Sequence, residues 1–368
     1  MTFLCQIERK MGKIAGGKKK QGKVIEKRKV FRDNGGKRLG QRTLERGRGM
    51  NLLRTKPIFK QMIWGGSRMA DQFGYELPGD HTGEAWAVSA HPSGDCVVEY
   101  EGCDWRLSDL WREHRELFGG MEREEFPLLT KIIDAAADLS IQVHPDDTYA
   151  QVQVNGALGK TECWYILDAE PGATIIIGHH ARTKEELRQM VAEKRFGELI
   201  REVPVKAGDF FQIEPGCVHA IKGGTLLLET QQSSDITYRL YDYDRLQDGK
   251  PRELHLEKSM DVITCPMKEA VTETVCRYQG ENGSLVEQLV RCDHYTVARG
   301  KVEGQLTLAD IRGKEPAPYF DIFSVIAGEG NLDGVDLKKG DHFLLPYGYE
   351  EEKQGLFQGN LEFIHAIP

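Results

Sequence analysis

The chain has 368 residues, of which 40% are hydrophobic, so it can bury the core of one large domain or of two ordinary ones. Residues 1–49 carry a charge of +12 and the other 319 residues carry −20, which together give the net charge of −8. A body this acidic excludes nucleic acid as a general partner, because the phosphate backbone repels it. No apolar run approaches the length of a membrane-spanning helix, which excludes that class of protein.

The cysteines and the N-terminus bear on the cellular compartment. Eight cysteines are spread along the chain without a C-x-x-C pair, which favours reduced thiols over a disulfide framework or a cysteine-rich zinc site. Residues 1–49 contain no Ser and no continuous apolar core, so neither a secretory signal nor a typical transit peptide is expected. We therefore expect a cytoplasmic protein.

Residues 1–49 are rich in Gly, Lys and Arg and lack apolar periodicity, which predicts a disordered basic leader. One interpretation is an arm that binds nucleic acid or a membrane surface. The other, which we prefer, is an in-frame extension without a role, upstream of a natural start at Met50. The character of a globular enzyme begins at Asn51, and we expect a catalytic domain over residues 50–269 and a C-terminal domain over residues 270–368.

The first globular elements are expected between residues 82 and 138. Residues 82–92 are typical of a strand that runs into a turn. Apolar residues at helical spacing predict a helix over residues 107–118, with Ser108 as an early cap. Residues 126–133 predict a buried strand, which ends in a turn over residues 134–138.

The stretch from residue 140 to residue 147 carries the first candidate site residues. Gln142 and His144 point to the same side of a strand, since successive side chains alternate. A Pro-Asp-Asp turn ends this strand, and residues 163–167 predict the next one, with Glu162 at its start. An imidazole, a carboxylate and an amide oxygen on neighbouring strands suit zinc or a similar divalent ion, with one ligand still missing.

The second half of the chain favours short strands. Residues 173–178 predict a strand, and Thr183 with Glu186 forms a capping-box pattern that predicts a helix to about residue 194. Beyond it, short strands broken by Gly and Pro indicate an antiparallel sandwich or barrel and not a βαβ array. No nucleotide-binding fingerprint is present, which argues against ATP or NAD chemistry.

An internal repeat lies in the strand-rich part. Residues 208–216 and 340–348 each contain a Gly-Asp turn, a short strand and a turn with Pro and Gly, which predicts two copies of one jelly-roll unit. His219 follows the first copy, whereas Tyr-Glu-Glu follows the second. We therefore expect metal in the first barrel and none in the second.

Three residues extend the candidate site downstream of the first copy. A lone His is more often structural, but His219 follows a Gln-x-His strand and a Glu in a repeated barrel, and we take it as the missing ligand. Glu229 is then a carboxylate near a metal, available for acid–base work, and Arg239 is a fixed cation suited to an anionic substrate or a developing enediolate. By spacing alone, Glu229 and Arg239 fit a salt-bridged surface pair equally well.

Several ordered motifs closely resemble the zinc-dependent type I mannose-6-phosphate isomerases, in their short bacterial form. The similarity runs from about residue 57 to the C-terminus and is carried by residues 63–66, 83–94, 140–147, 159–165, 215–220 and 234–239. It implies a mostly β fold of two cupin-type jelly-roll barrels, with a few helices inserted in the N-terminal catalytic part. It also implies one zinc ion per chain.

The resemblance assigns roles to nine residues. Its metal ligands would be Gln142, His144, Glu162 and His219. Arg239 matches the catalytic arginine, and Glu229 and Lys160 match the proposed acid–base groups. Ser140 and Lys131 match positions associated with the substrate phosphate.

The implied activity is the reversible interconversion of mannose 6-phosphate and fructose 6-phosphate through a cis-enediol. Two other classes stay open from the residues: a non-catalytic cupin that binds a sugar phosphate, and a cupin oxygenase with a redox-active metal. The expected partner is a small sugar phosphate, without nucleic acid or membrane. We expect a monomer, with a weak homodimer as the alternative.

Overall fold

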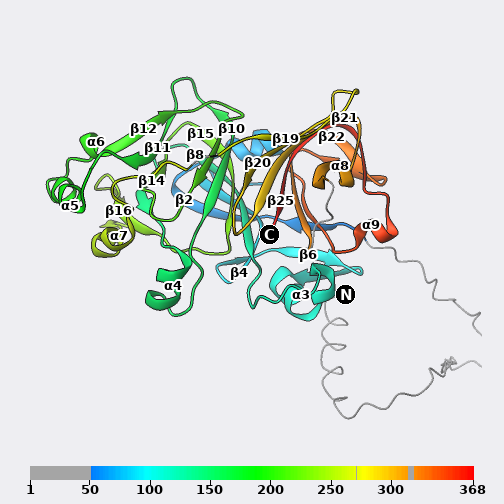
Figure 1. Cartoon of the computed structure of the whole chain (residues 1–368), viewed down its shortest axis with the longest axis horizontal. Coiled ribbons are helices and arrows are strands. Elements are labelled where there is room, and N and C mark those ends of the chain that lie inside the picture. Colours follow the sequence, from blue (N-terminus) through cyan, green and yellow to red (C-terminus); the bar gives the residue numbers. More distant parts are fainter. Residues whose placement is uncertain (1–50, 271, 314–318) are drawn as a thin grey trace, which may run out of the picture. The chain divides into compact units, whose positions relative to one another are not determined.

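The computed structural model describes residues 51–270, 272–313 and 319–368. The predicted basic leader of residues 1–49 lies outside the described residues. Residues Met50–Pro368 form one compact unit, built mostly of antiparallel strands with short helices at its edges (Figure 1). No helix within the described ranges is long and apolar enough to cross a membrane.

Two sheets form the first barrel. The larger has the strand order β13 (Phe210–Ile213), β10 (Glu162–Ala169), β15 (Thr225–Gln232), β8 (Leu128–Ala135), β2 (Ile58–Gly66) and β3 (Thr82–Val88). The other has the order β12 (Ile200–Pro204), β11 (Thr174–His179), β14 (His219–Ile221), β9 (Ile141–Val143) and β16 (Tyr238–Tyr241). Trp64, Trp164, Ile175 and Leu227 belong to one buried cluster supplied by both sheets.

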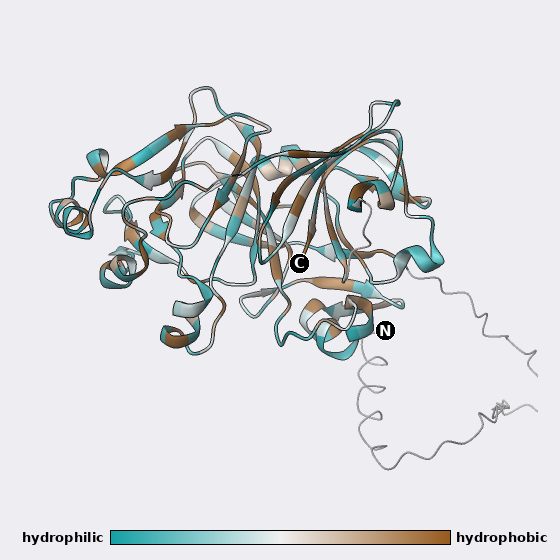
Figure 2. Ribbon diagram, in the orientation of Figure 1, coloured by the Kyte–Doolittle hydropathy of each residue, from teal (hydrophilic) through white to brown (hydrophobic). Residues whose placement is uncertain are grey.

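A ten-stranded sheet forms most of the C-terminal part. Its order is β19 (Val275–Gln279), β20 (Leu285–Arg291), β21 (Thr296–Thr307), β25 (Leu356–Ile367), β22 (Asp321–Leu332), β24 (His342–Leu345), β1 (Leu53–Lys56), β6 (Val97–Tyr100) and β7 (Cys103–Arg106), with β23 (Val335–Lys338) on β22. The N-terminal strand β1 therefore pairs with β24. Hydrophobic residues concentrate in the strands of these sheets (Figure 2). The boundary at residues 269 and 270 stays a prediction.

The predicted repeat is reproduced in the hydrogen bonds of the two copies. In the first, the amide of Ile166 donates to the carbonyl of Asp209 at 2.9 Å, and the carboxylate of Asp209 accepts from the amide of Lys206 at 2.9 Å. In the second, Val325 donates to Asp341 in the same way, also at 2.9 Å, and Asp341 accepts from Lys338 at 2.9 Å. Equivalent turns thus join equivalent strands in both barrels.

Nine helical segments occur among the described residues: α2 (Arg68–Phe73), α3 (Leu107–Glu113), the 3₁₀ helix η2 (Arg115–Phe118), α4 (Asp147–Gln153), α5 (Lys184–Ala192), α6 (Phe196–Leu199), α7 (Leu256–Val262), α8 (Leu308–Arg312) and α9 (Tyr349–Glu352). The helix predicted over residues 107–118 is interrupted at His114. Ser108 lies inside α3 and is not its cap, because its hydroxyl donates to the carboxylate of Asp95 at 2.6 Å. Thr183 caps α5 as predicted.

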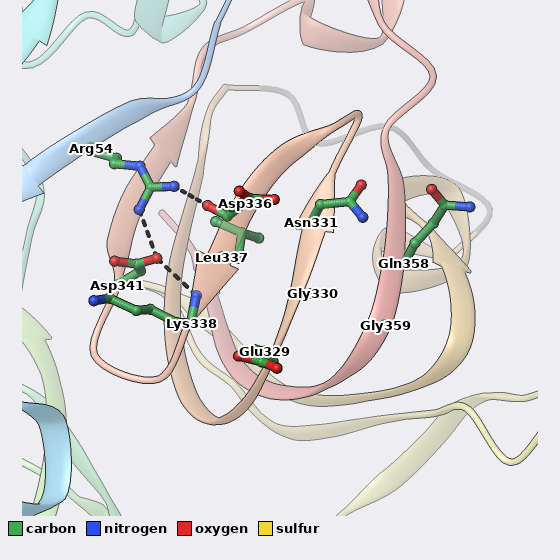
Figure 3. Close-up of a pocket in the computed structure, with 10 residues that line it drawn as sticks. All are labelled: Arg54, Glu329, Gly330, Asn331, Asp336, Leu337, Lys338, Asp341, Gln358 and Gly359. Carbon is green, nitrogen blue, oxygen red and sulfur yellow. Dashed lines mark hydrogen bonds and ion pairs between the residues drawn. The ribbon is translucent and has the colours of Figure 1, made fainter.

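A row of glycines lies across three long strands of the C-terminal sheet. Gly359 in β25 pairs with Gly304 in β21 on one side and with Gly330 in β22 on the other. A Cβ on Gly359 would lie 2.6 Å from the Cα of Gly330, so only glycines allow this close approach. Gly330 and Gly359 also line a pocket of about 550 Å³, together with mostly polar residues (Figure 3).

Most of the cysteines are free thiols, as expected. Those described as free are Cys96, Cys163, Cys217, Cys265, Cys276 and Cys292. Cys103 is disulfide-bonded, so the expectation of reduced thiols is wrong at this position.

Candidate functional site

Three strands of the first barrel bring two imidazoles and one carboxylate together. His144 directly follows β9, Glu162 begins β10, and His219 begins β14. Each offers one ligand atom, and these atoms lie within 4.8 Å of one another. All three residues are at most 1% exposed, so the cluster is screened from bulk water. This set can hold a metal ion.

Backbone carbonyls orient both imidazoles toward the centre of this cluster. The Nδ1 of His144 lies 2.7 Å from the carbonyl oxygen of Ile236, and the Nδ1 of His219 lies 2.9 Å from that of Cys217. With Nδ1 donating, each Nε2 keeps a free electron pair that can bind a metal ion. The two Nε2 atoms are 3.1 Å apart, and each is within 3.5 Å of a Glu162 oxygen.

The protonation states also suit a metal. Burial, aided by the charge of Lys160, lowers the pKa of His144 to about 3, and burial lowers the pKa of His219 as well. Burial alone would raise the pKa of Glu162, but the Lys160 ammonium and the imidazoles hold it well below its ordinary value. Neutral imidazoles and an ionised carboxylate are the forms that bind metal ions.

Gln142 and Arg239 lie in one row with His219. Gln142 pairs with His219 across β14 and with Arg239 across β16. The amide nitrogen of Gln142 is 3.4 Å from Nε2 of His219, so its side chain reaches the cluster. Arg239 is anchored by a 2.8 Å hydrogen bond to the carbonyl of Glu253, and its Nε is buried without a partner among the described residues.

Buried charges of alternating sign run from the cluster across the larger sheet. The Nζ of Lys160 lies 2.6 Å from Glu162 and 3.7 Å from Glu229. The Nζ of Lys131 lies 3.5 Å from Glu229 and 3.9 Å from Glu84. Burial and the charge of Glu162 raise the pKa of Glu229. Burial would lower the pKa of Lys160, but Glu162 and Glu229 raise it. A carboxylate between two ammonium groups is therefore available next to the metal cluster.

Two groups of residues near this row were not singled out by sequence. Glu84 accepts a 2.6 Å hydrogen bond from the indole of Trp86, and Lys131 lies 5.0 Å from the centre of that ring. The motif of residues 83–94 contains Glu84 and Trp86, but its local pattern only indicated a strand. Arg245 and Arg252 both bind the carboxylate of Asp242, just beyond β16, and no local pattern separated them from surface arginines.

Ser140 is the predicted site residue with the least direct support. It immediately precedes β9 and is 4% exposed. The structure thus places Ser140 just before the first residue of the strand that carries Gln142, and its role stays a prediction. A cavity of about 570 Å³ is lined by residues that include His91, Trp111, Leu158 and residues 233–236, and none of the predicted site residues lines it.

The two barrels and the buried cluster define a cupin-type protein with a candidate metal centre in its first barrel. The sequence model of the catalytic domain of type I phosphomannose isomerase matches residues 52–193. The chain is 50% identical to mannose-6-phosphate isomerase ManA of Bacillus subtilis over 308 residues, which cover 81% of this chain and 94% of that protein. It is 46% identical to the mannose-6-phosphate isomerase of Streptococcus mutans, over 84% of this chain and 97% of that protein.

A solved structure agrees with these relatives. The crystal structure of the mannose 6-phosphate isomerase from Bacillus subtilis superimposes with a TM-score of 0.80 at 41% identity, over 86% of this chain and 99% of that one. The chain therefore belongs to the type I phosphomannose isomerase family. The predicted mostly β, cupin-type fold is confirmed.

Proposed function

We propose that this protein interconverts D-mannose 6-phosphate and D-fructose 6-phosphate, with one zinc ion held by His144, Glu162 and His219. The observation that carries the proposal is the position of Lys160, whose Nζ lies 2.6 Å from Glu162 and 3.7 Å from Glu229. A candidate metal centre and a candidate proton carrier thus share one buried site. The relatives from Bacillus subtilis and Streptococcus mutans are named as mannose-6-phosphate isomerases.

The reaction requires a proton to move between two neighbouring carbons of the sugar. Glu229 or Lys160 would remove the proton next to the carbonyl and return it to the adjacent carbon, through a cis-enediol. Arg239 would stabilise the negative charge that develops on the sugar oxygen. Burial of the site keeps water away from the intermediate.

The donor set supports zinc. Two imidazoles and one carboxylate are a common ligand set of catalytic zinc sites, which keep an open position. Gln142 would be a fourth ligand, because its amide reaches His219. When bound, the ion would supply Lewis-acid polarisation of the sugar oxygens.

The phosphate requires fixed positive charge. Ser140 and Lys131 are the proposed contacts, and the arginines that share Asp242 add further cations near Arg239. We place the approach of the sugar phosphate at the 570 Å³ cavity, because Ile236 lines it and the carbonyl oxygen of Ile236 lies 2.7 Å from Nδ1 of His144. We expect a cytoplasmic monomer without nucleic-acid or membrane partners.

The test is a coupled assay with mannose 6-phosphate, run beside a measurement of bound metal. We expect turnover, stoichiometric zinc, loss of activity with a chelator and recovery with zinc. The full chain and a chain begun at Met50 should turn over equally, since the family match begins at residue 52. In deuterated water, absence of label at carbon 2 would indicate internal proton transfer.

Other outcomes would favour the two rival classes. Binding of the sugar phosphate without turnover would indicate a non-catalytic cupin. Stoichiometric iron with oxygen consumption would indicate an oxygenase. Failure to isomerise mannose 6-phosphate with zinc present would reject the proposed function.

A further inference from the structure

Lys160 lies on the loop that leads into β10 and is not itself part of a strand. The segment between α4 and β10 has no regular secondary structure from residue 157 to residue 161. Lys160 is nevertheless only 5% exposed. Its ammonium group lies close to Glu162, Glu229 and His144. A long, flexible side chain keeps such a position only if its backbone is fixed.

Two side chains outside the described chemistry fix that backbone. The carboxylate of Asp147 accepts a 2.7 Å hydrogen bond from the amide of Gly159, on one side of Lys160. The side-chain oxygen of Gln232 accepts a 2.8 Å hydrogen bond from the amide of Thr161, on the other side. The backbone of Gln232 also donates to the carbonyl of Thr161 at 3.0 Å.

Asp147 and Gln232 are joined to each other. The Nε2 of Gln232 lies 3.0 Å and 3.3 Å from the two carboxylate oxygens of Asp147. Gln232 is 2% exposed, so its amide cannot exchange these partners for water. A Cβ on Gly159 would lie 2.5 Å from the amide nitrogen of Asp147, which shows how closely the loop packs on the start of α4.

We infer that Asp147 and Gln232 are positioning residues that clamp the backbone on both sides of Lys160. This inference rests on the proposed function for its effect on catalysis. The clamp acts through the amides of Gly159 and Thr161, and neither Asp147 nor Gln232 belongs to the candidate metal cluster. Because Glu162 is held separately in the β10 ladder, loosening the clamp should displace Lys160 and leave the metal ligands in place.

The test compares Asp147→Ala and Gln232→Ala with Asp146→Ala in the full chain. Asp146 is the exposed cap of α4 and accepts from the amide of Tyr149 at 2.7 Å, so its removal weakens the same helix without opening the clamp. We expect the two clamp variants to lose about 10- to 100-fold in kcat, with KM and bound metal near wild type. Asp146→Ala should keep its kcat, and Asp147→Asn, which retains an acceptor oxygen, should recover most of it.

Three results would overturn the clamp: a wild-type kcat in Asp147→Ala, an equal loss in Asp146→Ala, or loss of the metal in either clamp variant. A second readout does not depend on activity. Amide hydrogen exchange of the peptide over residues 154–161 should be about fivefold faster in Asp147→Ala than in Asp146→Ala. If the wild type does not isomerise mannose 6-phosphate, the proposed function fails, and this exchange difference alone decides whether the clamp exists.

Discussion

Glu229 is the buried carboxylate on which the proposed proton transfer depends. It is 3% exposed, and its Oε1 lies 3.5 Å from Lys131 and 3.7 Å from Lys160. Glu229→Gln keeps the size of the side chain and removes the base. We expect kcat to fall by about 10²- to 10⁴-fold with metal content unchanged, as measured by the coupled assay and metal analysis. The same substitution at Glu202, whose ion pair with Lys222 is exposed, should leave kcat unchanged. Full activity in Glu229→Gln would remove it from the mechanism.

Asp321 occupies in the second barrel the position of Glu162 in the first. Glu162 pairs with Ile213, and Asp321 pairs with Leu345, at the same point of the repeated turn and strand. Asp321 accepts hydrogen bonds from Arg312 at 3.0 Å and from His365 at 2.8 Å. A guanidinium thus provides here the positive charge that a metal ion would provide beside Glu162.

This pairing predicts a large stability effect. Asp321→Asn removes the buried one of the two carboxylates that pair with Arg312 and leaves only Glu350, whose oxygen lies 2.6 Å from the guanidinium; loss of a buried partner typically costs up to about 3–5 kcal/mol. Urea unfolding should show this loss in the free energy of unfolding. Asp336→Asn, at an exposed position, is the control and should change it by less than about 0.5 kcal/mol. If Asp321→Asn left the free energy of unfolding nearly unchanged, the pair would contribute no net stability.

The same carboxylate predicts a pH dependence. Burial alone would raise the pKa of Asp321, but hydrogen bonds from His365 and Arg312 lower it below its ordinary value. Because the folded pKa lies below the unfolded value of about 3.9, the contribution is complete above that pH and is lost as the pH falls through the folded pKa. The difference in unfolding free energy between wild type and Asp321→Asn should therefore be constant near neutral pH and shrink below about pH 4. A difference that grew on acidification would contradict this assignment.

At the scale of elements, a row of glycines lies across β21, β22 and β25, and Figure 3 shows two of them, Gly330 and Gly359. Gly359 has φ +121°, and a Cβ there would also lie 2.8 Å from the carbonyl of Glu329. Gly359→Ala should therefore lower the free energy of unfolding by about 1–3 kcal/mol in a urea titration. Gly197→Ala, in α6 with open space around the new methyl group, should be neutral or slightly stabilising. Equal stability of both variants would show that the glycine row tolerates a side chain.

Helix ends were predicted unevenly from sequence. Thr183 caps α5, because a cap and the amide it accepts from lie three residues apart in the chain. Ser108 was predicted as a cap only from its place at the start of an apolar periodic stretch, but Asp95 accepts from both its amide and its hydroxyl. A carboxylate thirteen residues away therefore replaces the local cap, and only the fold of the intervening hairpin brings it there.

At the scale of the whole molecule, the N- and C-terminal parts share one core. The ring of Phe320 lies 5.2 Å from that of Phe118, 5.3 Å from Phe126 and 6.2 Å from Trp111. Strand β1 also completes the C-terminal sheet through β24. A fragment of residues 50–269 would expose these rings and an unpaired strand edge.

We therefore expect the fragment of residues 50–269 to aggregate when it is produced alone. The soluble fraction, size-exclusion chromatography and a thermal melt check this, with the chain of residues 50–368 as the control. A soluble fragment with a cooperative melt would support an independent catalytic domain with its boundary near residue 269.

The sequence by itself determined the class of fold, the family and the candidate residues. Strand alternation, the repeated Gly-Asp turn and the His-bearing motifs are local patterns, and the chemistry of a metal ligand is a property of its side chain. The tertiary structure decided which groups meet. Pairing of β1 with β24, the Arg312 counter-charge and the Asp147–Gln232 clamp join residues far apart in the chain or on separate elements. Such contacts depend on how the sheets close, and closure leaves no periodic signal in the residues that it brings together.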